Sequence, residues 1–381
     1  MTEVKFKNET IDPVILMDKL GVEYAEYIAL LMNEVITSAY AEQHAKELQQ
    51  KHAMRELFRA CQDGIKIACS ENNATDAISK IDTMIMNATK HITTSRLTEI
   101  MYIAEKRFSK YHEDEARGKS FDGYPSGYIE LDKKISGFAL GESTIIAARP
   151  SMGKTSYALN ITLNIAKKGI PVLFFTLEQN EEGITDRLLC IEGKINNKRY
   201  RNRRLDETEK NSLGKAYSRL IQLPIKIVDG SINTSQMRSF VARELRESKD
   251  LLVISDFLTL FTDYPQLSAH ERYGYVAKRI QSMAKEFKIP FITLAQLNRQ
   301  LEQRNNKKPI LSDLRESGNI EEAADKVLFL YRDEYYNPDT KDTNIAEVLC
   351  AKNRDGETGL IKLLWQPEYY KFANLAREAP F

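Results

Sequence analysis

The sequence of 381 residues lacks several features that mark particular classes of protein. Its 55 lysine and arginine residues almost equal its 54 aspartate and glutamate residues, so any nucleic-acid binding must come from local loops and not from an overall positive field. No apolar run approaches the ~20 residues that span a bilayer, and no charged-then-apolar signal peptide is present. We therefore expect a soluble, cytoplasmic protein with no membrane partner.

Cysteine is also scarce, and its spacing has no pattern. The four residues Cys61, Cys69, Cys190 and Cys350 are scattered without the Cys-x-x-Cys spacing of a zinc site. Because cytoplasmic proteins keep their thiols reduced, we interpret all four as buried free thiols.

Proline and glycine are nearly absent before residue 115, where Pro13, Gly21 and Gly64 are the only examples. Apolar residues recur there at helical spacing, which suits an amphipathic helix. An example of this spacing is the set Met54, Leu57, Phe58, Cys61 and Ile65. The region is therefore predicted to be all-α, a helical hairpin flanked by shorter helices.

A polar segment at 110–127, broken by glycine and proline, is predicted to be a linker. Beyond it, apolar runs alternate with helix-like segments, which indicates an α/β domain on a mainly parallel sheet. These runs lie at 143–148, 171–177, 224–229, 251–257, 290–297 and 326–331. Short, closely spaced strands at 346–374 are predicted to add a hairpin to the sheet edge.

The central motif is Ala-Arg-Pro-Ser-Met-Gly-Lys-Thr at 148–155, between an apolar run and a helix-like segment. Backbone N–H groups of such a loop and the dipole of the following helix together favour a bound phosphate. Lys154 would reach the β and γ phosphates of ATP, and the Thr155 hydroxyl would bind Mg²⁺. The predicted ATP contacts are Ser151, Met152, Gly153, Lys154, Thr155 and Ser156. Ala148 departs from the generic motif, which begins with glycine.

Polar side chains follow three of the predicted strands. Asp256 ends an apolar strand in the form of a Walker B segment and is expected to hold Mg²⁺ through water. Glu178 lies at the carboxyl end of another strand, where ligands of open α/β sheets collect, and could deprotonate water. Gln296 is suited to sensing a γ-phosphate without adding charge. Taken alone, each acid could equally be a helix N-cap or a surface charge.

Two basic segments leave their role open. Arg299, Arg304, Lys307, Lys308 and Arg315 could contact a phosphodiester backbone, or could simply be solvated. The run 194–204, with six basic residues and no acid, carries the same ambiguity.

Five blocks, taken together, closely resemble the DnaB-type replicative DNA helicases, in order and with the family's spacing across roughly 120–375. They are Ala-Arg-Pro-Ser-Met-Gly-Lys-Thr at 148–155, Ala-Gln-Leu-Asn-Arg at 295–299, Ser-Asp-Leu-Arg-Glu-Ser-Gly-Asn-Ile-Glu at 312–321, Leu-Tyr-Arg-Asp-Glu-Tyr-Tyr at 330–336 and Ala-Lys-Asn-Arg-Asp-Gly at 351–356. The family itself carries alanine at the position of Ala148. The resemblance implies a RecA-like P-loop NTPase core.

The resemblance also implies a role for each of the predicted site residues. Lys154 and Thr155 look like the phosphate and Mg²⁺ ligands, Glu178 like the catalytic base, and Asp256 like the Walker B acid. Gln296 looks like the γ-phosphate sensor.

Three further groups take roles from the resemblance alone. Lys352 and Arg354 match the pair that the family projects from a β-hairpin into the neighbouring subunit's nucleotide site. Arg315, Glu316 and Gly318 match the loop that holds single-stranded DNA in the ring's channel. Arg332 is placed near the nucleotide base.

The implied function is that of an ATP- and Mg²⁺-dependent, homo-hexameric replicative helicase. It would move 5′ to 3′ on single-stranded DNA and unwind forked duplex at a replication fork, with a helicase loader and a primase as further candidate partners. Two alternatives stay open. One is a non-catalytic or weakly active modulator subunit, against which the complete set of hydrolysis residues argues. The other is a RecA-like repair ATPase, which would lack the 315–318 and 352–354 blocks in this form.

The N-terminal region departs from the family pattern, since the chain is expected to begin partway through the usual helical domain. The hairpin would span 39–69 and 74–90, and the linker helix about 95–113. This gives a truncated helical domain at 1–94, a linker helix and linker at 95–122, and a RecA-like ATPase domain at 123–381. The shortened domain puts loader and primase contacts in question.

Overall fold

A computed structural model describes residues 41–71, 73–89, 100–116, 118, 121–256, 258, 261–263 and 267–375. The chain divides into two compact units, Met1–Ile100 and Met101–Phe381. The shorter helices expected before the hairpin, at 1–40, lie outside the described residues.

The first unit contains a pair of packed helices, α4 (Ala41–Ser70) and α5 (Ala74–Thr89). Small residues line the contact: Ala60 is buried, and a Cβ added at Gly64 would be 3.5 Å from Ile81, in ordinary van der Waals contact. The apolar residues Met54 and Phe58 are instead 66% and 63% exposed. The amphipathic stripe read from the sequence is therefore not the face that packs within the hairpin, because close helix approach selects the small residues.

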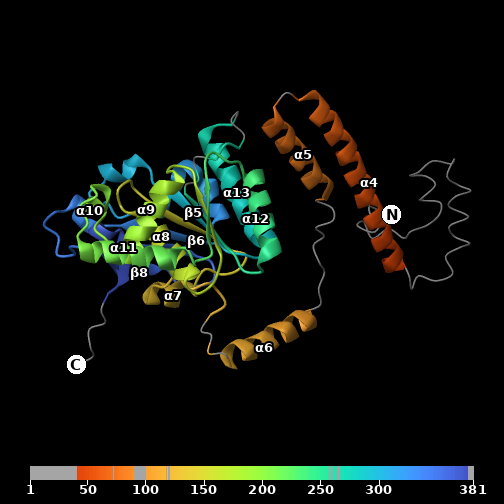
Figure 1. The fold of residues 1–381 in the computed structure, drawn as a ribbon. Helices are drawn as coiled ribbons and strands as arrows, with labels where there is room; N and C mark the ends of the chain where they lie inside the picture. Colours follow the sequence, from red (N-terminus) through yellow and green to blue (C-terminus); the bar gives the residue numbers. More distant parts are fainter. Residues whose placement is uncertain are drawn as a thin grey trace, which may run out of the picture. The chain divides into compact units, whose positions relative to one another are not determined.

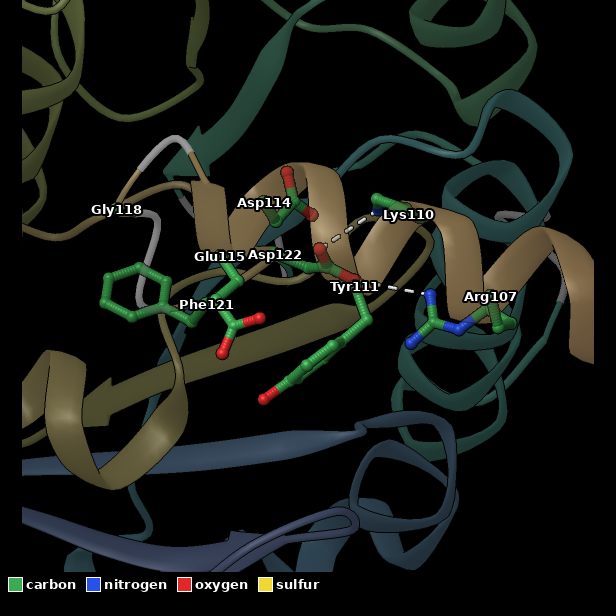
Figure 2. A pocket seen from close by; sticks show the side chains of 8 residues that line it. All are labelled: Arg107, Lys110, Tyr111, Asp114, Glu115, Gly118, Phe121 and Asp122. Atoms are coloured by element: carbon green, nitrogen blue, oxygen red, sulfur yellow. Dashed lines mark hydrogen bonds and ion pairs between the residues drawn. The ribbon is translucent and has the colours of Figure 1, made fainter.

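The helix α6 (Ile100–Ala116), in the segment predicted to be a linker helix, lies at the start of the second unit. Figure 2 shows a pocket between this helix and Gly118, Phe121 and Asp122, in which Asp122 pairs with Arg107 at 3.3 Å and Lys110 at 3.0 Å. The hydrogen bond from Lys110 is the largest cause of a lowered pKa of Asp122. These pairs hold the end of α6 to the segment that enters the larger domain.

Nine strands form one sheet within the described residues, in the order β3-β2-β4-β5-β1-β6-β7-β8-β9. They are β1 (Ser143–Ala148), β2 (Val172–Thr176), β3 (Ile225–Asp229), β4 (Leu252–Asp256), β5 (Phe291–Gln296), β6 (Lys326–Tyr331), β7 (Ile345–Asn353), β8 (Gly359–Gln366) and β9 (Lys371–Asn374). The first six run parallel, and β7 to β9 add antiparallel strands at one edge. The predicted α/β class with a mainly parallel sheet is confirmed.

Helices cover both faces of this sheet (Figure 1). The described helices after α6 are α7 (Ile129–Ile135), α8 (Lys154–Ala166), α9 (Glu181–Gly193), α10 (Asn197–Arg201), α11 (Glu207–Leu220), α12 (Thr234–Glu247), α13 (Ala269–Phe287), α14 (Gly318–Ala323) and α15 (Asp333–Tyr336), with the 3-10 turns η4 (Arg299–Gln303), η5 (Leu311–Ser317) and η6 (Pro367–Tyr369). One apolar core joins the sheet to α8 and α9, and the other joins it to α12 and α13. The domain is thus a three-layer α/β/α structure.

Alternation along each strand decides which residues enter which core. In β4, Leu252 and Ile254 pack with the α8 core, whereas Val253 between them packs with the α13 core. Because side chains of a strand alternate between its two faces, even-numbered residues of β2, β4 and β5 all face α8. This parity sets where the polar side chains at the strand ends will point.

The antiparallel strands support α8 from its other side. Asn160, only 3% exposed, donates from Nδ2 to the Tyr370 carbonyl at 2.9 Å and accepts at Oδ1 from the Phe372 N–H at 3.2 Å. Phe372 packs edge-on against Tyr157 and also contacts Trp365. The helix that begins at the phosphate-binding motif is therefore fixed to β9.

The expectation that all four cysteines are buried was wrong for two of them. Cys190 and Cys350 are buried, but Cys61 and Cys69 are exposed on α4. Across the part of the chain that the structure describes, no helix combines the length and apolar character needed to cross a bilayer.

We expect Asn160→Ala to lower the free energy of unfolding of this domain by about 1–3 kcal/mol, because buried groups of β9 lose their partner. Trp365 is the chain's single tryptophan and is 4% exposed, so its fluorescence during urea unfolding reports this region. The control is Asn164→Ala, which removes one partly buried bond to the Ser126 carbonyl. Equal shifts of the unfolding midpoint in the two variants would contradict the role given to Asn160.

Candidate nucleotide-binding and hydrolysis site

The motif at 148–155 forms a tight loop between β1 and α8. Ser151 and Gly153 have positive φ angles of 67° and 95°, and a Cβ on Gly153 would lie 3.2 Å from Phe372. Glycine is thus required at 153 by both conformation and space. Because Gly153 is also the N-cap of α8, no side chain at that position covers the first-turn N–H groups, which suits them to an anion.

Thr155 and Asp256 meet beneath this loop. The Thr155 hydroxyl donates to Asp256 Oδ2 at 2.6 Å, and the two residues are 8% and 1% exposed. Asp256 Oδ1 is buried and has no hydrogen-bond partner among the described atoms. A hydroxyl beside a carboxylate with an unused oxygen fits Mg²⁺, a cation that prefers oxygen ligands.

Lys154 is partly buried and lies near two acids. Burial lowers the pKa of its ammonium group, while the charges of Asp256 and Glu178 act to raise it. Desolvation therefore outweighs the attraction of the two carboxylates in this structure. A phosphate bound at the loop would add negative charge beside this ammonium and favour its protonated form.

Strand parity and register bring the remaining predicted residues to the same place. Thr176 of β2 is in register with Asp256 of β4, and Ala148 of β1 with Gln296 of β5. Glu178 lies two residues beyond Thr176 and, like Gln296, is exposed. Asp256, Glu178 and Gln296 therefore all follow the carboxyl ends of neighbouring parallel strands.

Ser255, the residue beside Asp256, shows that alternation along the strand decides which polar side chain faces the loop. Ser255 faces the other core, where its hydroxyl donates to the Thr293 hydroxyl at 3.2 Å. Of the two adjacent polar residues, only the carboxylate faces the nucleotide loop.

Two arginines lie near the loop. Arg332 donates from Nη1 to the Ser151 carbonyl at 3.3 Å, and its guanidinium lies 5.5 Å from the Trp365 ring centre. Arg187 of α9 lies 5.3 Å over the Tyr370 ring. Burial is the main cause of a lowered pKa of Arg187, while Tyr370 and, more weakly, Asp256 and Glu178 act to raise it.

Sequence reasoning missed Arg187. Its neighbours on the same helix, Ile184, Leu188 and Ile191, are buried in the core. The sequence contained a signal for Arg187, because it is a charged residue within this i, i+4, i+7 apolar stripe. A guanidinium on the inward face of a helix requires a polar or charged partner.

Comparison with known proteins points to one family. The family model described as "DnaB-like helicase C terminal domain" matches residues 123–374. Replicative DNA helicase DnaC of Bacillus subtilis is 35% identical over 98% of this chain and 83% of its own length. Replicative DNA helicase DnaB of Geobacillus stearothermophilus is 33% identical over 99% of this chain and 86% of its own length.

The chain belongs to the DnaB-like helicase family. Solved structures agree: an ATPase domain that is 34% identical covers 72% of this chain and 99% of its own, with a TM-score of 0.69. A DnaB-like replicative helicase solved in a study of its interactions with primase is 28% identical, covers 98% of this chain and 90% of its own, and has a TM-score of 0.78. The RecA-like core is confirmed, and the protein is a DNA helicase and ATPase by family.

The structure of this DnaB-like helicase keeps Lys352 and Arg354 away from its own nucleotide loop. β7 runs antiparallel to β6, so Asn353 is in register with Lys326, the first residue of β6, which pairs with Thr144 near the start of β1. The nucleotide loop follows the opposite end of β1. At about 3.3 Å per residue, the strand alone separates the two levels by about 13 Å.

Lys352 and Arg354 bind α14 instead. Lys352 Nζ donates to the Glu321 carbonyl at 2.6 Å, and Arg354 Nη2 donates to the Glu322 carbonyl at 3.2 Å. Burial is the main cause of a lowered pKa of Lys352, followed by the nearby charge of Arg354.

The segment matched to the DNA-binding loop lies at η5 and the start of α14, where Arg315, Glu316 and Gly318 occur. The side chains at 315–318 lie outside the part of the chain that the structure describes. Two of the other basic candidates have partners within the chain: Arg304 pairs with Asp313 at 2.8 Å, and Lys308 with Glu347 at 2.6 Å. These two residues therefore stabilise the loop before η5.

We expect Asp256→Asn to abolish most of the Mg²⁺-dependent part of nucleotide binding, at least about tenfold or ~1.4 kcal/mol, while the nucleotide-free protein stays as stable. Asparagine keeps an acceptor for the Thr155 hydroxyl and removes only the buried charge. Nucleotide-induced thermal shifts with and without Mg²⁺ measure this. Ser255→Ala is the matched control on the other face, and equal Mg²⁺ dependence in both variants would contradict the assignment.

Proposed function

We propose that the protein is an ATP-driven, homo-hexameric replicative helicase that moves 5′ to 3′ along single-stranded DNA and unwinds duplex at a replication fork. The observation that carries this proposal is the separation of two groups of residues. The nucleotide loop, Asp256, Glu178 and Gln296 collect at the carboxyl ends of the parallel strands. Lys352 and Arg354 lie near the amino ends of the same strands. A site that needs both groups is completed by a second copy of the chain.

The residues of one chain support a division of labour in hydrolysis. The N–H groups of α8 and the Lys154 ammonium would hold the phosphates, and Thr155 with Asp256 would hold Mg²⁺, which neutralises charge on the phosphate oxygens when bound. The Glu178 carboxylate, exposed at its strand end, would accept a proton from the attacking water. The neutral Gln296 amide would hydrogen-bond a γ-phosphate oxygen and so distinguish bound ATP from product.

The neighbouring copy would supply the remaining charge. An arginine acting from a second subunit is worth ~10³ to 10⁵ in rate, or roughly 4 to 7 kcal/mol of barrier. An interface that joins one side of a subunit to the opposite side of the next subunit is head-to-tail. Such an interface closes into a ring when the rotation that relates neighbouring subunits allows it.

The near-neutral chain is compatible with DNA binding in such a ring. Copies of the 311–318 segment from all subunits would act together on one strand, so that weak single contacts gain by effective concentration. A helicase loader and a primase are proposed as further partners. For the primase, support comes from the solved DnaB-like relative, whose structure was determined in a study of its interactions with primase.

Arg354→Ala should remove most ATPase activity, by about 10³-fold or more, and leave nucleotide binding intact, since the variant keeps its own loop. Steady-state turnover and equilibrium nucleotide binding on the same preparation measure the two effects. Lys362→Ala in β8 serves as control, because it removes an exposed cation that pairs with Asp342. Full turnover by a verified monomer would refute action between subunits.

Unwinding of a forked duplex tests the activity as a whole. The protein should separate the strands in the presence of ATP and Mg²⁺, and Glu178→Ala should not, although it still binds nucleotide and DNA. If the natural chain unwinds no better than Glu178→Ala, the modulator-subunit alternative replaces the helicase proposal.

A further inference from the structure

We propose that Asp325 is a positioning residue for hydrolysis: it holds Arg354 of its own subunit in the orientation needed at the neighbouring subunit's nucleotide site. This inference rests on the function proposed above. Asp325 precedes β6 and therefore lies near the amino ends of the parallel strands, away from the nucleotide loop. Its carboxylate binds Ser143, Gln281 and Arg354 there.

Asp325 is itself firmly fixed. It is 5% exposed, and its Oδ2 accepts from the Ser143 N–H at 2.9 Å. Its Oδ1 accepts from Gln281 Nε2 at 3.3 Å, and its own N–H donates to the Ser143 carbonyl at 2.9 Å. The carboxylate is thus tied to the start of β1 and to α13, both parts of the rigid core.

Arg354 is held by this carboxylate and by nearby carbonyls. Its Nη1 donates to Asp325 Oδ1 at 3.0 Å, and its own N–H donates to the Asp325 carbonyl at 3.1 Å. Nη2 reaches the Glu322 carbonyl at 3.2 Å. The side chain is still 47% exposed, so part of a group with five N–H donors remains turned outward.

The Asp325–Arg354 ion pair is expected to affect the rate of hydrolysis and the stability of the fold to different extents. An ion pair with one partner half-exposed contributes little to folding, because water screens it and two side chains must be ordered. An arginine that acts from outside depends strongly on orientation, and a displacement of about 1 Å can cost ~10² in rate. The pair should therefore influence turnover far more than folding.

The same contacts join Arg354 to the segment proposed to hold DNA. The carbonyls of Glu321 and Glu322 belong to the last turn of α14, and α14 follows directly from η5. Cations near the end of a helix are well placed to bind its last carbonyls. A change at 311–318 would thus reach Lys352 and Arg354 through one short helix.

The first test is Asp325→Asn, which keeps an acceptor for the Ser143 N–H and removes the charge that holds Arg354. We expect kcat for ATP to fall about 10- to 100-fold with KM within about twofold of the natural protein, because the variant's own nucleotide loop is untouched. Gln281→Leu, which removes only one bond to the same carboxylate, should give a smaller loss in the same direction. The Gln281→Leu variant can still test the proposal if Asp325→Asn fails to fold.

The matched control is Glu142→Gln. Glu142 pairs with Lys326 at the same edge of the sheet, and this pair includes neither Asp325 nor Arg354. Its kcat should stay close to that of the natural protein, with urea unfolding followed through Trp365 to compare stabilities. An equal loss of kcat in Glu142→Gln and Asp325→Asn would indicate a general structural defect and overturn the proposal.

Mixed rings give the decisive readout. When Asp325→Asn is co-assembled with Glu178→Ala, the second variant presents a correct Arg354 to the intact nucleotide site of the first, so ATPase activity should exceed the sum of the two alone. Co-assembly of Asp325→Asn with Arg354→Ala should restore nothing, because both variants are defective in the same group.

A third mixture separates this inference from the function on which it rests. Glu178→Ala with Arg354→Ala should regain activity if Arg354 acts between subunits, whatever the role of Asp325. Failure of this mixture would refute the proposed function itself. Success here combined with no recovery for Asp325→Asn plus Glu178→Ala would overturn the positioning role alone.

Discussion

The structure depends on the register of four neighbouring parallel strands, β2, β4, β5 and β1. Each ends at the same edge of the sheet, and alternation along the strand turns the even-numbered residues toward α8. Asp256 therefore meets the first turn of α8, whereas Ser255 beside it faces the other core. A shift of one residue in β4 would exchange the two and remove the carboxylate from the loop.

Placing charged side chains beneath the nucleotide loop lowers the stability of the nucleotide-free fold. Asp256 is taken out of water and Lys154 partly so, and one oxygen of Asp256 has no described hydrogen-bond partner. Such groups reduce the stability of the nucleotide-free fold and become favourable when a phosphate and a cation enter. The aromatic residues Trp365 and Phe372, packed against Gly153, keep the loop in place meanwhile.

The antiparallel strands place a second group of charged residues at the other end of the parallel strands. Because β7 reverses the direction of β6, Arg354 comes out beside the start of β1 and not beside its end. One chain therefore carries the nucleotide loop and the Lys352/Arg354 pair near opposite ends of the parallel strands. The contacts of Arg354 with Asp325 and with α14 place Arg354 next to the segment 311–318, so the proposed nucleotide and DNA functions share a small set of backbone groups.

Local sequence patterns were enough to predict the parallel strands and the placement of the loop 148–155, Glu178 and Asp256 at their carboxyl ends, because each is encoded by adjacent residues. The exposure of Cys61, the inward position of Arg187 and the pairing of Asp325 with Arg354 were not predicted. Each depends on which elements pack together, and the bonded residues Ser143 and Asp325 are 182 positions apart. Neighbouring residues along the chain thus specify the chemistry at the strand ends, whereas the edge that each group occupies follows from strand order and direction, which packing between distant segments sets.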